Sequence, residues 1–386
     1  VNAGNSIASG GNYNTVVGDE AGTAITTGDN NVAIGYVAGD AITTGSESVA
    51  LGSNSLSAAT TSTKNTALGA YALRNDTLGS SSVAVGHQAL NAQNFTSATA
   101  AYNVAVGANA GVAVTTGTKN TLIGGLAGDA ITTGGNNTAV GSTALSANTT
   151  AEGNAAVGAR ALEANTTGAY NSALGDGSLR TNTTASSNTA VGQASLQNNT
   201  TGATNTALGR NALQLNTTAS NNTAVGYAAL STNTTATNNT AVGSESLAAN
   251  TSGAQNTAVG VSSMKATTTG GDNTALGFNS LVVNTTGTGN TALGRSTLDA
   301  NTSASNNTAV GSNALGANTT GAENTASGKQ ALTVNTTGAN NTAHGSRALG
   351  SNTTASNNTA VGRDALLLNT TGTQNVAVGA LSLDAN

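Results

Sequence analysis

A 17-residue internal repeat constrains the fold of this chain more than any other feature of its sequence. Glycines that close an Asn-Thr-Ala-Val-Gly-like segment stand at Gly18, Gly35, Gly52, Gly69 and Gly86, and then from Gly107 at every seventeenth residue to Gly379. We call these 22 residues the marker glycines; 20 of the 21 intervals between them equal 17. Helical-hairpin repeats need about 33 residues or more, so this period excludes them.

Each repeat has a fixed anatomy when positions are counted from its marker glycine. Asn stands at −4 in nearly every copy, Ala at −2 in 20 of 22 copies, and Val, Leu or Ile at −1 in 20 of 22. A small residue follows at +3, Leu at +4, and Asn-Thr-Thr begins at +7, as in Asn148-Thr149-Thr150. Short strands bounded by Asn and Gly turns fit this pattern, and the same residues disfavour helix.

The repeat length predicts one coil of a narrow solenoid, because 17 residues at about 3.3 Å each give a closed path of roughly 55 Å with two short strands. Residues 1–386 are therefore predicted to form a single continuous, all-β, parallel β-solenoid (β-roll) of about 22 coils, with a four-residue insertion within 91–102. The complete absence of Pro agrees with this, since Pro cannot donate to a β-ladder. In-register stacking predicts Asn ladders at −4 and +7 that lock the turns, with the marker glycines at corners of positive φ.

Four coils exchange a bulky side chain between two positions. Their Leu at +4 is replaced by glycine and their Asn at +7 by a β-branched apolar residue, in the pairs Gly22/Ile25, Gly39/Ile42, Gly111/Val114 and Gly128/Ile131. Both positions are therefore predicted to fill one shared core.

The alanines at −2 suggest self-association. Neighbouring side chains of a strand face opposite ways, so if the −1 Val fills the coil, the −2 Ala points outward. An outward stripe of 20 Ala along a rod would mark an interface, and three rods around a common axis are the simplest arrangement.

The residues also carry a resemblance to a known family. The stretch Thr26-Thr27-Gly28-Asp29-Asn30-Asn31-Val32-Ala33-Ile34-Gly35 resembles the repeat of trimeric autotransporter adhesin heads, as do Ser48-Val49-Ala50-Leu51-Gly52 and Ser82-Val83-Ala84-Val85-Gly86. The Asn-Thr-Ala-Val-Gly-x-x-Ala-Leu-x-x-Asn-Thr-Thr-Gly form is similar to repeats of phage-type tail fibres. The resemblance implies a left-handed β-roll assembled as a homotrimer, although the coil of 17 residues is longer than the about 14 of adhesin heads.

Charge and hydropathy exclude several classes of partner. The net charge of −5 and the pI near 4.8 oppose nucleic-acid binding, which requires a basic stripe. No apolar run reaches about 18 residues, so no membrane insertion is expected in this segment. No secretory signal opens the chain, and the pattern is cut at both ends, so we expect a segment of a longer fibrous protein with flanking anchor or tip domains.

Chemistry-bearing residues are sparse. A glycosidase needs two carboxyl groups about 5–10 Å apart, and the nearest candidates for such a pair are Asp19 and Glu20 with Asp40 or Glu47. The favoured interpretation is that these acidic side chains are solvated turn residues. Calcium loops, which place Asp at fixed positions in every repeat, are absent. The sequence predicts no enzyme, no cofactor and no metal site.

Two singular features remain as candidate sites. Ser327 and His344 occupy the −1 column in adjacent coils, as a local packing variation or an anion- or pH-sensitive core site. The insertion carries Phe95 and Tyr102, which either present an exposed contact loop or tuck back against the coil, the latter being favoured.

The expected function is a structural rod of a cell-surface or virion appendage, extracellular, that contributes to adhesion to a host-surface glycan or protein receptor. The alternatives are an extracellular filament subunit that stacks end to end, an ice-binding solenoid built on the Thr columns, and a polysaccharide-degrading tailspike. The asparagines of the Asn-Thr-Thr triplets match the N-glycosylation sequon but are interpreted as structural.

Overall fold

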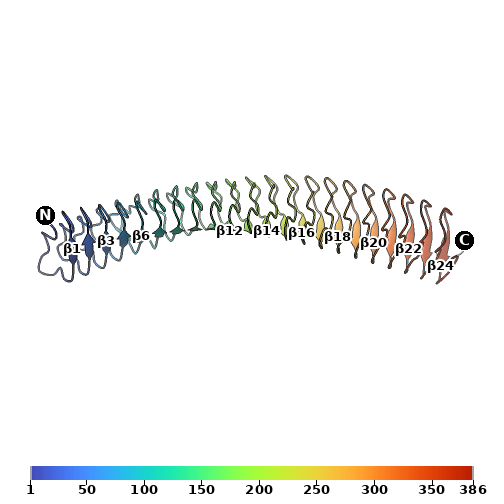
Figure 1. The fold of residues 1–386 in the computed structure, drawn as a ribbon, viewed down its shortest axis with the longest axis horizontal. Helices are drawn as coiled ribbons and strands as arrows, with labels where there is room; N and C mark the ends of the chain where they lie inside the picture. The colour runs from blue at the N-terminus through green and yellow to red at the C-terminus, as the bar shows by residue number, and fades with distance from the viewer. Residues whose placement is uncertain (1, 385–386) are drawn as a thin grey trace. The chain divides into compact units, whose positions relative to one another are not determined.

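The computed structural model describes residues 2–384 and divides into two compact units, Val1–Gln193 and Ala194–Asn386. Each unit is an all-β, parallel β-solenoid, as the repeat predicts (Figure 1). The first unit contains β1 (Thr15–Val17), β2 (Val32–Ile34), β3 (Val49–Leu51), β4 (Thr66–Leu68), β5 (Gly79–Ser80), β6 (Val83–Val85), β7 (Thr99–Ala100), β8 (Val104–Val106), β9 (Thr121–Ile123), β10 (Thr138–Val140), β11 (Ala155–Val157), β12 (Ser172–Leu174) and β13 (Thr189–Val191).

The second unit repeats the same element. Its strands are β14 (Thr206–Leu208), β15 (Thr223–Val225), β16 (Thr240–Val242), β17 (Thr257–Val259), β18 (Thr274–Leu276), β19 (Thr291–Leu293), β20 (Thr308–Val310), β21 (Thr325–Ser327), β22 (Thr342–His344), β23 (Thr359–Val361) and β24 (Val376–Val378).

Strands of successive coils pair in parallel, with like positions opposite one another. Ala139 of β10 pairs with Ala156 of β11, and Ala224 of β15 pairs with Ala241 of β16. A regular coil holds one strand of three residues rather than the two strands that we predicted. The remainder of the coil consists of turns, which are joined to the next coil by backbone bonds such as that from the Thr132 N–H to the Thr149 carbonyl. These turns bond in register although they are not part of a strand.

The direction of the strand side chains is opposite to our prediction. All 20 Ala at −2 are buried, each at most 3% exposed, whereas the −1 residues point outward. The interior is already filled by Leu at +4, as in Leu145 and Leu230, and by the two Asn columns. Only a methyl group fits in the remaining space, so the alanines line the core and the larger β-branched residues face out.

The two exceptions at −2 show the same packing rule. Val16 and Leu122 are larger than Ala, and both lie where the adjacent +4 positions are glycine. A Cβ on Gly22 would lie 2.7 Å from Val16 Cγ1, and one on Gly128 would lie 2.7 Å from Leu122 Cδ2. A bulky side chain at −2 therefore takes the room that the +4 side chain vacates.

The glycine-for-leucine exchange confirms the predicted shared core. A Cβ on Gly39 would lie 3.0 Å from Ile42 Cδ1, and one on Gly128 would lie 2.8 Å from Ile131 Cδ1. The side chains at +7 therefore occupy the space of the missing +4 side chain.

Both Asn columns are buried ladders, but they bond differently. At +7, Asn165 Nδ2 donates to Asn148 Oδ1 at 3.1 Å and to the Gly168 carbonyl at 2.9 Å. At −4, the main contact runs from a backbone N–H to a side chain: the Asn137 N–H donates to Asn120 Oδ1 at 3.0 Å. The +7 amides bond as predicted, and several −4 amides do so too, as where Asn290 Nδ2 donates to Asn273 Oδ1 at 3.1 Å. In both columns the Asn side chain also donates to the carbonyl of a turn.

Candidate functional surfaces

The strand positions −3 and −1 form an outward face in each unit. Position −1 carries Val, Leu or Ile in 20 of 22 coils, and position −3 is mostly Thr or Val. Leu208, Leu276 and Val310 at −1 are 37%, 46% and 40% exposed. An apolar column of this kind marks an interaction surface. The outward apolar stripe that we expected at the alanines therefore lies at the residues on either side of them.

Ser327 and His344 lie in this outward column rather than in the core. They are opposite one another in the β21–β22 pair, where Ser327 is half-buried and His344 is exposed. The pair interrupts the apolar column of the second unit at two adjacent coils. Both of our interpretations, the packing variation and the anion- or pH-sensitive core site, placed these residues in the coil interior, and that placement is wrong because the −1 side chains face outward.

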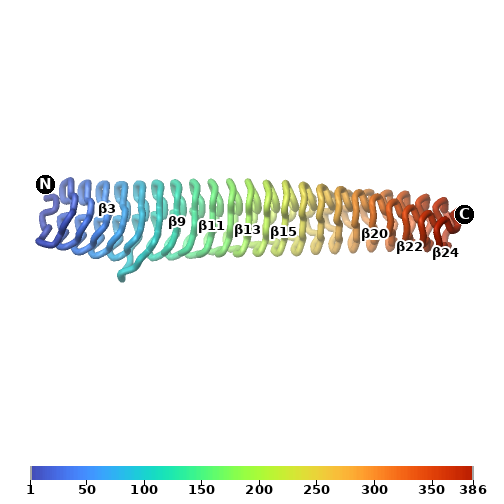
Figure 2. The backbone as a smooth tube through the Cα atoms, turned by 90° about the horizontal axis from the view of Figure 1, so that it is seen from below, coloured from blue at the N-terminus to red at the C-terminus, as the bar shows by residue number. Residues whose placement is uncertain are grey.

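The insertion separates its two aromatic side chains. Phe95 is 5% exposed and packs inward, which confirms the favoured interpretation, whereas Tyr102 is 58% exposed. Figure 2 shows the tube leaving the regular outline in cyan, where the exposed residues 96–98 lie. The short strands β5 and β7 pair in parallel next to this excursion, and like positions are again opposite one another where β6 pairs with β8, as Ala84 with Ala105.

A buried polar network next to the insertion was missed from the sequence. Asp76 and Gln93 replace Asn at +7 in adjacent coils, and Gln93 Nε2 donates to Asp76 Oδ2 at 2.6 Å. The Gly79 N–H donates to Asp76 Oδ1, and Asn103 Nδ2 donates to Gln93 Oε1. Burial raises the pKa of Asp76, opposed first by the Gln93 hydrogen bond. The interruption of the +7 Asn column was the sequence signal for it.

The acidic candidates lie mostly in solvent. Asp19, Glu20 and Glu47 are exposed, and Glu47 Oε2 lies 3.9 Å from Lys64 Nζ. The pKa of Asp40 is raised, mainly by its partial burial and further by the charge of Glu20. Within residues 2–384, no group of three or more His, Cys, Asp or Glu is arranged to hold a metal ion. No helix in the same range has the length and hydrophobicity of a membrane span.

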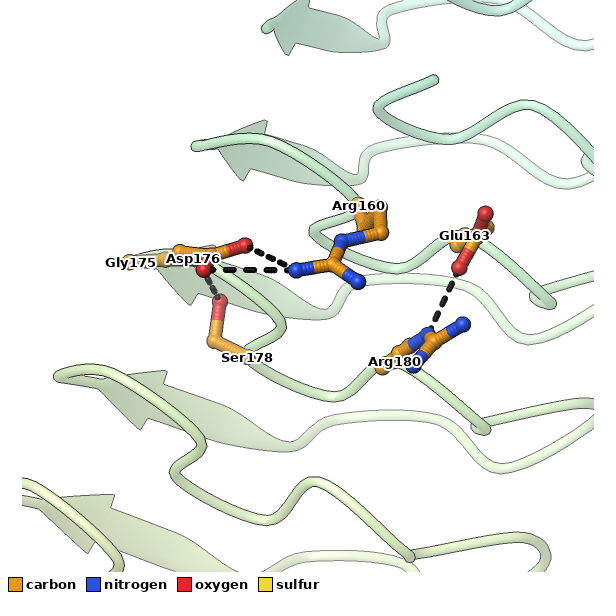
Figure 3. A network of polar contacts seen from close by, with 6 residues as sticks. All are labelled: Arg160, Glu163, Gly175, Asp176, Ser178 and Arg180. Atoms are coloured by element: carbon orange, nitrogen blue, oxygen red, sulfur yellow. Dashed lines mark hydrogen bonds and ion pairs between the residues drawn. The ribbon is translucent and has the colours of Figure 1, made fainter. Parts of the chain in front are cut away.

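Several surface charges pair between neighbouring coils. Arg160 Nη2 lies 3.2 Å from Asp176 Oδ1, and Arg180 Nε lies 2.8 Å from Glu163 Oε2 (Figure 3). Exposed pairs of this kind contribute about 0.2–1 kcal/mol each, so they tune the surface rather than hold the coils together.

The Thr residues at +8 and +9 have different roles. Thr166 Oγ1 donates to the Thr183 carbonyl at 3.0 Å, which ties the +8 hydroxyl into the stack. Thr150 and Thr167 at +9 are exposed. One of the two Thr columns therefore faces solvent. The Asn of each Asn-Thr-Thr triplet is buried and hydrogen-bonded, in agreement with a structural role.

Neither a protein-family model nor a curated protein matches the chain.

Proposed function

We propose that this chain is a structural rod of a cell-surface or virion appendage and that it assembles as a homotrimer of left-handed β-rolls through the outward face. The single observation that supports this proposal is the half-exposed apolar column at −1, repeated in the coils of both units. In this role the protein is extracellular, its first partner is a second copy of itself, and it presents weak contacts to a host surface.

The size of the column supports stable association. Full burial of a Val or Leu side chain stabilises by about 1.5–3 kcal/mol, so covering a half-exposed one contributes roughly 1 kcal/mol. Association of rigid bodies costs about 4–15 kcal/mol once, whereas the contribution of the column recurs in every coil. The summed contribution of the column therefore exceeds the free-energy cost of association after a modest number of coils.

The coil construction suits a mechanical role. Successive strands pair in register, and the Asn ladders add side-chain bonds parallel to the backbone ladder. Repetition also presents identical surface positions at every coil, which converts weak contacts into avidity. The acidic residues are dispersed and largely exposed, which favours a non-enzymatic role over a tailspike hydrolase.

Lysines on the outward face test the proposal. The triple variant Leu208→Lys, Leu276→Lys, Val310→Lys should dissociate the trimer, because three charges per chain would be buried at a symmetric interface. The control Thr218→Lys, Thr286→Lys, Thr320→Lys adds the same charge at exposed +9 positions and should remain trimeric. Sedimentation velocity measures both.

The same variants, together with two further assays, distinguish the alternatives. Equal sedimentation of the two triple variants would contradict the proposed interface. Fibres that lengthen with concentration in both variants would favour end-to-end stacking. Thermal hysteresis that disappears only in the +9 variant would favour ice binding, and release of reducing ends from a host glycan would favour a tailspike.

A further inference from the structure

The residues that directly follow the marker glycines carry an uneven charge pattern. In the second unit this +1 column includes Arg210, Arg295, Lys329 and Arg363 and no acidic residue. In the first unit the same column includes Asp19 and Asp176 and no Lys or Arg. The second unit as a whole has six Lys or Arg and six Asp or Glu, and four of its six cations stand in this one column, so its cations are concentrated there rather than present in excess.

Three of these cations recur at alternate coils. Arg295, Lys329 and Arg363 are exposed and 34 residues apart, with Ser312 and Ser346 at +1 of the coils between them. We call these five residues the basic column. Two coils at the parallel-strand spacing of about 4.8 Å separate successive cations by roughly 9.6 Å.

Backbone bonds hold the basic column in register. The carbonyl of each +1 residue accepts the N–H of the +2 residue in the next coil: Arg295 from Asn313 at 3.1 Å, Lys329 from Arg347 at 3.0 Å. The column begins beyond the end of the strand, after the corner glycine, so it lies beside the outward apolar face and not on it.

A buried carboxylate, Asp364, contacts Arg363 at one end of the column and Arg347, a +2 residue beside the column. Arg347 Nη2 donates to Asp364 Oδ2 at 2.8 Å, and Arg347 Nε forms an ion pair with Oδ1 at 2.7 Å. Arg363 Nε lies 3.4 Å from the same Oδ2. The side chain of Asp364 is 3% exposed, whereas both arginine side chains are more than half exposed. One buried negative charge therefore orients two guanidinium groups that remain open to solvent.

Apolar and aromatic side chains continue the same column. Tyr227, Val261 and Phe278 stand at +1 in the coils that precede Arg295, and each is about half exposed. Ring faces of this kind pack against the C–H faces of sugars, and guanidinium and ammonium groups pair with carboxylates.

We propose that the basic column, with its aromatic extension, binds an acidic polysaccharide that lies along the stack of coils in the second unit. A glycan with one carboxylate on every second sugar presents charges at about the interval of the cations. Duplex nucleic acid carries one charge per about 1.7 Å, which a cation every roughly 9.6 Å leaves largely unpaired. This inference rests on the proposed function, because it names the class of surface that the rod contacts.

The test uses the full chain and immobilised hyaluronate, a polysaccharide with one carboxylate on every second sugar. The variant Arg295→Ser, Lys329→Ser, Arg363→Ser inserts the residue that the chain itself has at Ser312 and Ser346, so the fold is preserved. The matched control Lys64→Ser, Lys119→Ser, Arg160→Ser makes the same change of net charge in the first unit.

Wild type and control should bind hyaluronate within about twofold of one another, and the column variant about tenfold or more weakly, as expected for three exposed ion pairs. Wild-type binding should weaken as salt is raised, and neutral dextran should not bind. Failure of the wild type to bind hyaluronate, equal loss in both variants, or tighter binding to poly-glutamate or single-stranded oligothymidine would overturn the inference.

Light scattering on the same samples separates the two proposals. A trimer that does not bind hyaluronate contradicts only the polysaccharide inference. A monomer whose hyaluronate binding depends on the basic column contradicts only the proposed assembly.

Discussion

At the scale of single residues, the coil depends on backbone conformations that most residues avoid. The marker Gly69 has φ +133°, and in the same coil Leu73 at +4 has φ +48°. The left-handed conformation costs a non-glycine residue roughly 1–2 kcal/mol, whereas full burial of Leu contributes about 1.5–3 kcal/mol. Leu73 is fully buried, so its packing offsets the strain. A side chain at the marker position would have no comparable burial to offset the strain.

Gly69→Ala should therefore lower the free energy of unfolding by more than about 2 kcal/mol. Its Cβ would lie 2.6 Å from the Gly86 carbonyl oxygen of the next coil. Gly125→Ala is the control, because Gly125 has ordinary φ and nothing within 4 Å of the added atom, and should change stability by less than about 0.5 kcal/mol. Urea denaturation measures both, and equal effects would contradict the role of the corner.

Asp76 predicts a pH dependence of stability. Because burial raises its pKa, the folded chain binds this proton more tightly than the unfolded chain. The free energy of unfolding should therefore fall as pH rises from the ordinary carboxyl pKa through the raised one. Asp76→Asn restores the usual +7 residue and should stabilise the protein at pH 7 by roughly 1 kcal/mol, an advantage that shrinks toward pH 3.

Thermal unfolding of the Asp76→Asn variant and the wild type between pH 3 and pH 7 measures this difference. Asp272→Asn, at an exposed turn position, is the control and should change the free energy of unfolding by less than about 0.5 kcal/mol. An Asp76→Asn variant that is less stable than wild type throughout would show that the carboxylate is required by its network.

At the scale of the coil, the core is a fixed volume that several positions share. Coils with Gly at +4 carry Ile or Val at +7, and the two bulky −2 residues occur beside such glycines. The coil of Gly52 shows a third solution, with Leu56 at +4 and Ala59 at +7, both buried. Neighbouring positions are therefore energetically coupled rather than independent.

A double-mutant cycle at Gly39 and Ile42 tests this coupling. Gly39→Leu alone should destabilise by about 1–3 kcal/mol, because its side chain would overlap Ile42. Adding Ile42→Ala reproduces the Leu56/Ala59 arrangement of the next coil and should recover most of the loss. Denaturant unfolding of the four proteins gives the coupling energy, and additive effects would contradict a shared volume.

Much of the coil could be predicted from the sequence, because a strict period places equivalent residues of successive coils opposite one another. The parallel in-register stack, the corner glycines and the exchange of Gly128 with Ile131 follow from spacing and size alone. Side-chain alternation, however, does not specify which face points inward, and we assigned Val inside and Ala outside. Val16 and Leu122 carried the missing signal, because large residues at −2 occur only beside +4 glycines.

The candidate sites were harder to predict, since they depend on that same choice of face. We placed His344 in the core because we had placed the whole −1 column there. In the structure His344 and the other −1 residues face outward. Phe95 could be predicted to tuck inward from its hydrophobicity. The Asp76–Gln93 contact could not, because it requires the path of the insertion and the depth of the +7 column.

At the scale of the whole molecule, the chain combines an apolar face, a sorted set of charges and a polar Thr column. The first unit carries ten Asp or Glu against five Lys or Arg, which accounts for the entire net charge of −5. Repetition multiplies the effect of each column, so a small change at one position of the coil becomes a long stripe. Self-association through the outward face is the step on which the proposed rod depends.

The solution mass of the chain, by multi-angle light scattering at micromolar concentration, tests this step most directly. With a chain mass of 36.8 kDa, a homotrimer predicts about 110 kDa, independent of dilution across a tenfold range. A stable mass near 36.8 kDa would contradict the account, because the apolar face would then be exposed to water in the free protein.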